Sequence, residues 1–174
     1  MILNHRSQVG TVILLVGPKA VGKTWVAETL SSVLGIAYVD ADVLILDLLS
    51  TGQEPDTDVG WLMSVERAVC DVLTTSGSVS VEATGAWDSD YQLAHDLEAL
   101  GHRVIRIWLK APEETTIARL IARPPKKVPV SEALDRSIFA RCPSRAAREQ
   151  WHLEVDHSGE KDAELIADLV RAIM

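Results

Sequence analysis

The stretch TVILLVGPKAVGKTWVAETL, close to the start of the chain, restricts the possible folds more than any other part of the sequence. The apolar run Val12–Val16 predicts a strand covered on both faces, as in the centre of a parallel sheet. The segment Lys23–Leu34 predicts a helix, and Gly35 follows where a left-handed residue often ends one. Between them, residues 17–24 match the pattern G-x-x-x-x-G-K-[ST]. A strand directly before this pattern and a helix directly after it predict a phosphate-binding loop in an α/β fold.

Each part of the loop has a physical task. Glycines allow a tight turn in which several N–H groups point at one anion, and the following helix adds the positive end of its dipole. Lys23 can reach the β- and γ-phosphates of a nucleotide, and the Thr24 hydroxyl can ligate Mg²⁺. We therefore expect a nucleoside triphosphate and Mg²⁺ at this loop. The residues expected to bind the nucleotide are Gly17, Pro18, Lys19, Ala20, Val21, Gly22, Lys23 and Thr24.

The rest of the chain alternates predicted strands and helices. The further strands are Ile36–Asp40, Ser78–Glu82, Val104–Lys110 and His152–Asp156. The further helices are Leu62–Leu73, Asp88–Leu100, Pro112–Arg123 and Asp162–Ile173. This alternation predicts a parallel α/β sheet with helices on both faces. With 174 residues and 47% hydrophobic composition, the chain fits one domain, residues 1–174.

Charge and apolar patterning exclude several classes of protein. The net charge of −8 argues against a nucleic-acid binder, which would present a basic face. No apolar run approaches the ~20 residues that a bilayer span needs, and the first ten residues lack a signal-peptide core. Cys70 and Cys142 form no CxxC pair, which is typical of idle thiols in a reducing compartment. We expect a cytoplasmic protein that binds neither membrane nor nucleic acid.

Two aspartates, Asp40 and Asp42, come at the end of the second predicted strand. Side chains at i and i+2 of an extended chain point to the same side, so both carboxylates should project from the carboxyl edge of the sheet. One carboxylate there can hold the water shell of Mg²⁺, and the other can accept a proton from an attacking hydroxyl. The alternative is that Asp42 only caps a helix beginning at Val43 while Asp40 is solvated.

Two arginines stand four residues apart, Arg119 and Arg123, and neither has an acidic residue three or four positions before it. They are expected to bind an external anion such as nucleotide phosphates, or to stack on adenine. The alternative is that they have partners elsewhere in the fold. The polar, proline-rich segment 124–144 follows and is predicted to be a partly helical lid, with a surface excursion as the alternative.

With these motifs in order, the chain resembles the shikimate-kinase family within the nucleoside-monophosphate-kinase group of P-loop folds. The likeness is carried by GPKAVGKTWVAETLSSVLGIAYVDADVLI and by VIRIWLKAPEETTIARLIARP, where Arg123-Pro124 matches the lid Arg-Pro of the family. RCPSR is similar to a later stretch whose arginine, here Arg141, contacts substrate, and EVDHSG is similar to a segment near adenine. The resemblance implies ATP as phosphoryl donor and a three-layer P-loop kinase fold. It also implies a five-stranded parallel sheet in the order 2-3-1-4-5, with a lid.

The sequence departs from that family at the acceptor site. The family has three glycines after its third strand, whereas VEATGAW has only Gly85 and introduces Glu82. The family also has a carboxylate-binding arginine where LMSVE places Met63, and this loss should remove much of the affinity for shikimate. Trp61, Trp87 and Met63 can form an apolar wall for a different acceptor, or they can be core residues. Glu82 can assist Mg²⁺ or bind an acceptor hydroxyl, or be a plain residue at a strand end.

These features favour a kinase that transfers the γ-phosphoryl group of ATP to a hydroxyl of a small molecule, such as a metabolite or antibiotic, other than shikimate. The expected catalytic residues are Lys23, Asp42 and Arg123. Thr24 and Asp40 are expected to hold Mg²⁺, and Arg119 to join the nucleotide site. The residues expected to bind the acceptor are Asp42, Glu82, Gly85 and Arg141.

Two other functions stay open on the sequence. A nucleoside or nucleotide kinase usually needs several arginines around the acceptor phosphate, but the first 100 residues contain only Arg6 and Arg67. A regulatory ATPase would use the same loop without a small-molecule acceptor. The expected partner is a small hydroxylated acceptor, and the expected assembly is a monomer or homodimer.

Overall fold

The structure is a computed structural model that describes residues 9–50, 59–122, 132–157 and 163–174. Its strands are β1 (Thr11–Val16), β2 (Ala37–Val39), β3 (Ser78–Ala83), β4 (Arg103–Lys110) and β5 (Leu153–Asp156). Its helices are α1 (Lys23–Leu34), α2 (Ala41–Ser50), α3 (Val59–Ser76), α4 (Asp88–Ala99), α5 (Glu113–Ala122), α6 (Glu132–Ala146) and α7 (Ala163–Ile173).

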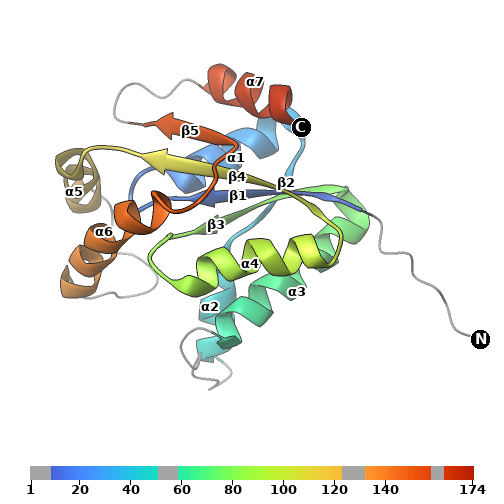
Figure 1. The fold of residues 1–174 in the computed structure, drawn as a ribbon, viewed down its shortest axis with the longest axis horizontal. Helices are drawn as coiled ribbons and strands as arrows, with labels where there is room; N and C mark the ends of the chain where they lie inside the picture. Colours follow the sequence, from blue (N-terminus) through green and yellow to red (C-terminus); the bar gives the residue numbers. More distant parts are fainter. Residues whose placement is uncertain (1–8, 51–58, 123–131, 158–162) are drawn as a thin grey trace, which may run out of the picture.

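The strands form one parallel sheet in the order β2-β3-β1-β4-β5, which confirms the predicted topology. Strand β1 lies at the centre, with Leu14 opposite Val81 of β3 and opposite Arg106 of β4. Helices α1 and α7 cover one face of the sheet, and α3 and α4 cover the other (Figure 1). Because all five strands run the same way, their carboxyl ends meet at one edge, where ligands of open α/β folds bind.

Strand β1 joins two separate hydrophobic cores. Its alternate residues Val12, Leu14 and Val16 pack with α3 and α4, and Ile13 and Leu15 pack with α1 and α7. All five side chains are almost completely buried, which explains why this strand is apolar throughout. Each such side chain contributes about 1.5–3 kcal/mol through burial. The strand therefore holds the loop that follows it on a rigid base.

The second predicted strand ends earlier than expected. Strand β2 stops at Val39, and helix α2 already begins at Ala41, so Asp42 lies in the first turn of a helix. The expectation that both carboxylates project from an extended chain is therefore wrong in its geometry. The physical reason is local: Oδ1 of Asp40 accepts the backbone N–H of Asp42 at 2.9 Å and that of Val43 at 3.4 Å, which starts the helix.

The predicted lid, residues 124–144, divides into two parts. Residues 124–131, together with Arg123, lie outside the described residues. Residues 132–144 belong to α6, which continues through Pro143 to Ala146. Helix α6 lies beyond the carboxyl ends of β4 and β1, beside α5 (Figure 1). Among the helices that the structure describes, none is both long enough and apolar enough to cross a bilayer.

Candidate nucleotide and acceptor site

The phosphate-binding loop makes a sharp turn between β1 and α1. Ala20 and Gly22 have positive φ angles of 59° and 110°, and Gly22 is the N-cap of α1. Glycine is also required at the entry, because a Cβ on Gly17 would lie 2.5 Å from the Leu109 carbonyl oxygen. The first turn of α1 offers N–H groups that no carbonyl of the same helix can accept. The loop thus has the shape and dipole of an anion site.

Lys23 is buried within this turn, at 8% exposure. Its Nζ donates to the Gly17 carbonyl at 2.7 Å and to the Pro18 carbonyl at 3.1 Å. A lysine at the start of a helix is unfavourable for the helix dipole, so its place here is not explained by helix stability. The ammonium group is held inside the loop where an anion would be bound.

Arg119 of α5 forms hydrogen bonds with the backbone of the same loop and of the segment after β5. Its Nη1 donates to the Val21 carbonyl at 3.3 Å, and its Nη2 donates to the His157 carbonyl at 2.8 Å. The contacts of Arg119 therefore agree with the alternative given above, in which this arginine has partners elsewhere in the fold. Its predicted contact with a nucleotide stays a prediction, and Arg123 lies outside the described residues.

A short chain of polar contacts links the loop to the ends of β2 and β3. The Tyr38 hydroxyl donates to Oε1 of Glu82, and the Thr24 side chain lies near enough to the same tyrosine to act on its pKa. Burial, followed by the charge of Glu82, raises the pKa of Tyr38 well above its usual value. Tyr38 was not identified as a site residue from the sequence, because nothing in the pattern distinguishes it from the other residues of the predicted strand. It brings Thr24 and Glu82, which were predicted separately, into one network.

The loop between β3 and α4 is shaped by one buried carboxylate. Asp90 is 2% exposed, and its Oδ2 accepts the Thr84 hydroxyl at 2.8 Å and the backbone N–H groups of Ala86 and Trp87 at 3.1 and 3.2 Å. Burial raises the pKa of Asp90, although these hydrogen bonds act in the opposite direction. Gly85 within the loop has φ +73°. Its predicted role toward an acceptor stays a prediction, but the backbone alone explains why this residue is glycine.

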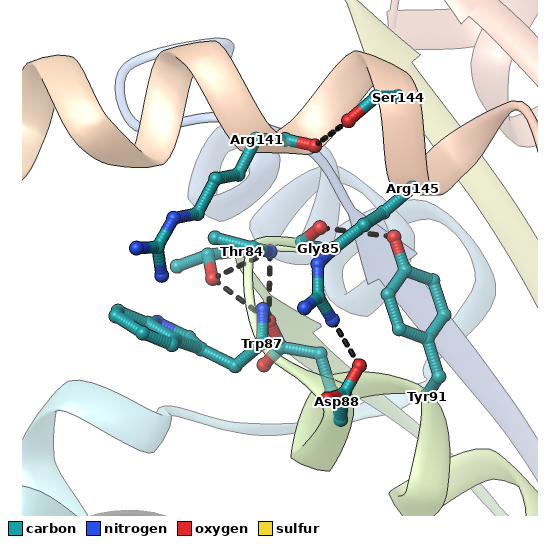
Figure 2. A network of polar contacts seen from close by, with 10 residues as sticks. Thr84, Gly85, Trp87, Asp88, Tyr91, Arg141, Ser144 and Arg145 are labelled. Atoms are coloured by element: carbon teal, nitrogen blue, oxygen red, sulfur yellow. Dashed lines mark hydrogen bonds and ion pairs between the residues drawn. The ribbon is translucent and has the colours of Figure 1, made fainter.

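Helix α6 lies over that loop, with Arg141 above Trp87 and Arg145 directed at Asp88, the first residue of α4 (Figure 2). The Arg141 guanidinium lies 5.2 Å from the centre of the Trp87 ring. Arg145, one turn later, forms an ion pair with Asp88. Between them, the Cys142 thiol donates to the Thr84 carbonyl at 3.0 Å, and burial raises the pKa of Cys142 to about 12. Cys142 is therefore a packed structural thiol, and the predicted acceptor residue Arg141 stands beside the loop of Gly85.

The three candidate wall residues are not alike. Trp61 and Trp87 are partly buried and pack against the core on the α3–α4 side of the sheet. Met63 is 65% exposed, so it is not a core residue. In the part of the chain that the structure describes, no group of three or more His, Cys, Asp and Glu residues could hold a metal ion. A metal here would need other ligands, as Mg²⁺ commonly finds in phosphates and water.

Comparison with known proteins agrees with this architecture. A family model described as an AAA domain, AAA_33, matches residues 12–148, from β1 to the turn after α6. The chain belongs to the AAA_33 family. This AAA_33 chain has the fold of a shikimate-kinase-like P-loop kinase, as predicted. No curated protein matches it in sequence.

Solved structures of several small-molecule kinases share the fold of this AAA_33 chain. Shikimate kinase from Acinetobacter baumannii, in complex with shikimate, is 21% identical with a TM-score of 0.57, covering 96% of this chain and 92% of that one. APS kinase from Mycobacterium tuberculosis, in complex with AMPPNP and APS, is 16% identical with a TM-score of 0.61, covering 94% and 98%. A gluconokinase from Sinorhizobium meliloti is 17% identical with a TM-score of 0.59, covering 96% and 92%. At these identities the likeness establishes the fold.

Proposed function

We propose that the protein is an ATP-dependent kinase that transfers the γ-phosphoryl group to a hydroxyl of a small molecule. The observation that carries the proposal is the phosphate-binding loop. Its two positive-φ residues and the buried Lys23 ammonium create an anion site at the N-terminus of α1, within a P-loop kinase fold. The neighbouring folds include kinases of shikimate, gluconate and APS, which supports a small acceptor.

The donor residues fit ATP and Mg²⁺ in their chemistry. The loop supplies N–H groups for phosphate oxygens, and Lys23 neutralises charge that grows on the transferred group. The Thr24 hydroxyl would ligate Mg²⁺ and Asp40 would bind its water shell, and the ion would supply positive charge to offset that of the phosphates. Capping of α2 uses Oδ1 of Asp40, and a carboxylate has a second oxygen for this task. Arg119 joins the nucleotide site from α5.

The acceptor hydroxyl is activated by Asp42 in this proposal. A carboxylate in the first turn of α2, three residues after the end of β2, lies at the carboxyl edge of the sheet. There Asp42 orients the hydroxyl and accepts its proton. Arg123 stabilises the transition state and, with the lid of residues 124–144, excludes the water that would otherwise hydrolyse ATP.

The acceptor itself is bound between the β3–α4 loop and α6. Arg141, held over Trp87, binds an acidic or polar part of the acceptor, with Glu82 and Gly85 near its hydroxyls. Met63 stands where shikimate kinases carry an arginine, so the acceptor is a different metabolite or an antibiotic. The exposure of Met63 supports a site wall there. We further propose a cytoplasmic monomer or homodimer that binds neither membrane nor nucleic acid.

A panel of hydroxylated acceptors, scored for ATP-dependent phosphorylation, tests this function. The panel includes shikimate, sugars, nucleosides and hydroxylated antibiotics, each with and without Mg²⁺. We expect transfer to at least one non-shikimate acceptor, loss of transfer in Asp42→Asn, and ATP binding unchanged in that variant. Efficient phosphorylation of shikimate would overturn the argument from Met63. Hydrolysis of ATP that no acceptor accelerates would favour a regulatory ATPase, and transfer only to nucleosides or nucleotides would favour that class of kinase.

A further inference from the structure

Two side chains that are distant in sequence form hydrogen bonds with the carbonyl oxygen of Val21. Nδ1 of His157 lies 2.7 Å from this oxygen, and Nη1 of Arg119 donates to it at 3.3 Å. Nη2 of the same arginine donates to the His157 carbonyl at 2.8 Å. These three residues, Val21, Arg119 and His157, form a closed set of contacts that we name the loop anchor. A carbonyl oxygen only accepts hydrogen bonds, so Nδ1 of His157 carries the proton in this arrangement.

His157 is fixed rather than adjustable in this position. Its backbone N–H donates to the Lys110 carbonyl at 2.7 Å, which continues the β4–β5 pairing one residue past Asp156. The side chain is 3% exposed, and the Trp25 ring covers it at a centroid distance of 5.3 Å. The sheet therefore sets where the imidazole stands, and the imidazole in turn sets where the loop carbonyl stands.

The imidazole also fills the space under the turn of the loop. A Cβ on Gly22 would lie 2.3 Å from Nδ1 and 2.4 Å from Cε1 of His157. Contacts under 3.0 Å do not occur without a shift of one partner, so the ring is packed directly against the backbone at Gly22. Gly22 is the residue whose positive φ turns the chain into α1. A displaced ring would let this turn relax.

We propose that His157 is a positioning residue for the phosphate-binding loop. Its Nδ1–H donates to the Val21 carbonyl and so fixes the direction of that carbonyl, and its ring packs against the backbone at Gly22. The two contacts keep the N–H groups of the turn and the head of α1 directed at the nucleotide phosphates. The inference rests on the proposed function, since it assumes that this loop binds ATP. In this proposal His157, the residue after β5, acts on phosphate binding only by positioning the loop. It makes no contact with the nucleotide itself.

Two amide substitutions separate this role from simple core packing. The side-chain nitrogen of asparagine stands as many bonds from the backbone as Nδ1, whereas that of glutamine stands as far as Nε2. His157→Asn therefore keeps a donor for the Val21 carbonyl, and His157→Gln places its donor elsewhere. His157→Ala removes both the donor and the ring.

The experiment measures the Kd for ATP with Mg²⁺, and the melting temperature, for the wild type and the three variants. We expect His157→Gln and His157→Ala to raise the Kd about tenfold, the size of one lost buried hydrogen bond. His157→Asn should raise the Kd less than His157→Gln does, because it retains the hydrogen bond although it loses the ring. His95, an exposed histidine of α4, provides matched controls, and His95→Asn and His95→Gln should leave the Kd unchanged.

The outcomes are distinguishable. Equal Kd values for all folded His157 variants, or an Asn variant no better than the Gln variant, would overturn the positioning role while leaving the proposed function intact. A wild type that does not bind ATP would overturn both. If His157→Ala fails to fold, the Asn and Gln pair still decides the question.

Discussion

The two ends of the candidate site are built in different ways. The proposed donor end is one contiguous segment, residues 17–24, whose backbone and buried Lys23 form the candidate anion site. The proposed acceptor end gathers side chains from the β3–α4 loop, the start of α4 and α6, joined by the Arg141–Trp87 contact and the Arg145–Asp88 ion pair. A contiguous backbone site keeps its chemistry while side chains around it change. A site assembled from distant side chains depends on each of them, so we expect substitutions there to alter acceptor specificity.

The largest expected effect is at the donor end. Lys23→Met keeps the volume of the side chain but removes the ammonium group that donates to Gly17 and Pro18. We expect kcat to fall about 10³-fold with every acceptor, because the lost charge acts on the transferred group. Lys110→Met, at an exposed lysine paired with Glu154 at 3.0 Å, should leave kcat unchanged. A Lys23→Met loss confined to one acceptor would break the division between the two ends.

The next effect is at the acceptor loop. Asp90→Ala leaves the Thr84 hydroxyl and the N–H groups of Ala86 and Trp87 without their acceptor. We expect the free energy of unfolding to fall by about 3 kcal/mol, and the acceptor KM to rise while the Kd for ATP stays constant. Chemical denaturation and steady-state kinetics measure the two quantities. A rise in the ATP Kd equal to the rise in acceptor KM would show that the loop serves both ends.

The pH dependence of the same residue sharpens this result. Burial raises the pKa of Asp90 above its usual 3.8, so folding favours the protonated form. That contribution to stability is fully present below the unfolded pKa and is lost as pH rises through the folded value. Asp90→Asn has no such titration, so its stability relative to the wild type should improve as pH rises across that window. A relative stability that worsens with pH would show that the hydrogen bonds outweigh burial.

A smaller effect is expected for Arg141→Ala. Loss of the guanidinium over Trp87 should raise the acceptor KM about tenfold without changing the Kd for ATP. Arg141→Lys should restore little, since lysine lacks the planar group that stacks on indole. Arg148→Ala, an exposed arginine in the turn after α6, serves as the control. An unchanged acceptor KM for every acceptor would remove Arg141 from the site.

The smallest effect concerns the link between the two ends. Tyr38→Phe removes the hydroxyl that contacts Glu82 and Thr24, and should cost about 1 kcal/mol of stability and change both KM values a few-fold. Tyr91→Phe, which removes a bond of 2.9 Å to the Gly85 carbonyl, should change only the acceptor KM. Identical kinetic profiles for the two variants would contradict a separate link at Tyr38.

The strand, loop and helix of the proposed donor end could be predicted from the sequence because their determinants are local. The predicted bounds of α1, Lys23–Leu34, agree with the structure, and every predicted strand end lies within one residue of the observed one. Apolar runs and glycines mark these elements by themselves. Where one side chain changed the local structure the prediction was wrong: Asp40 caps α2, so Asp42 lies in a helix.

The features of the candidate site that the sequence did not predict depend on contacts between residues far apart in the chain. Nothing in EVDHSG indicates that His157 reaches Val21, since the contact joins residues 136 positions apart. The same holds for Tyr38 and Glu82, and for the Arg141–Trp87 contact. The sequence predicts residues 124–144 only as partly helical, and it does not show that α6 continues through Pro143. Such contacts form only after the sheet order is set, and the sequence pattern specifies no pair of side chains.

The central position of β1 has a consequence for the synthesis of the chain. Strand β1 is synthesised before its two neighbours, since β3 and β4 begin only at Ser78 and Arg103. At about 5–20 residues per second, several seconds pass before either neighbour has been made. During that time TVILLV is an unpaired apolar strand, a form that invites aggregation. The segment that positions the phosphate-binding loop is thus also an apolar strand that stays unpaired through much of the synthesis of the chain.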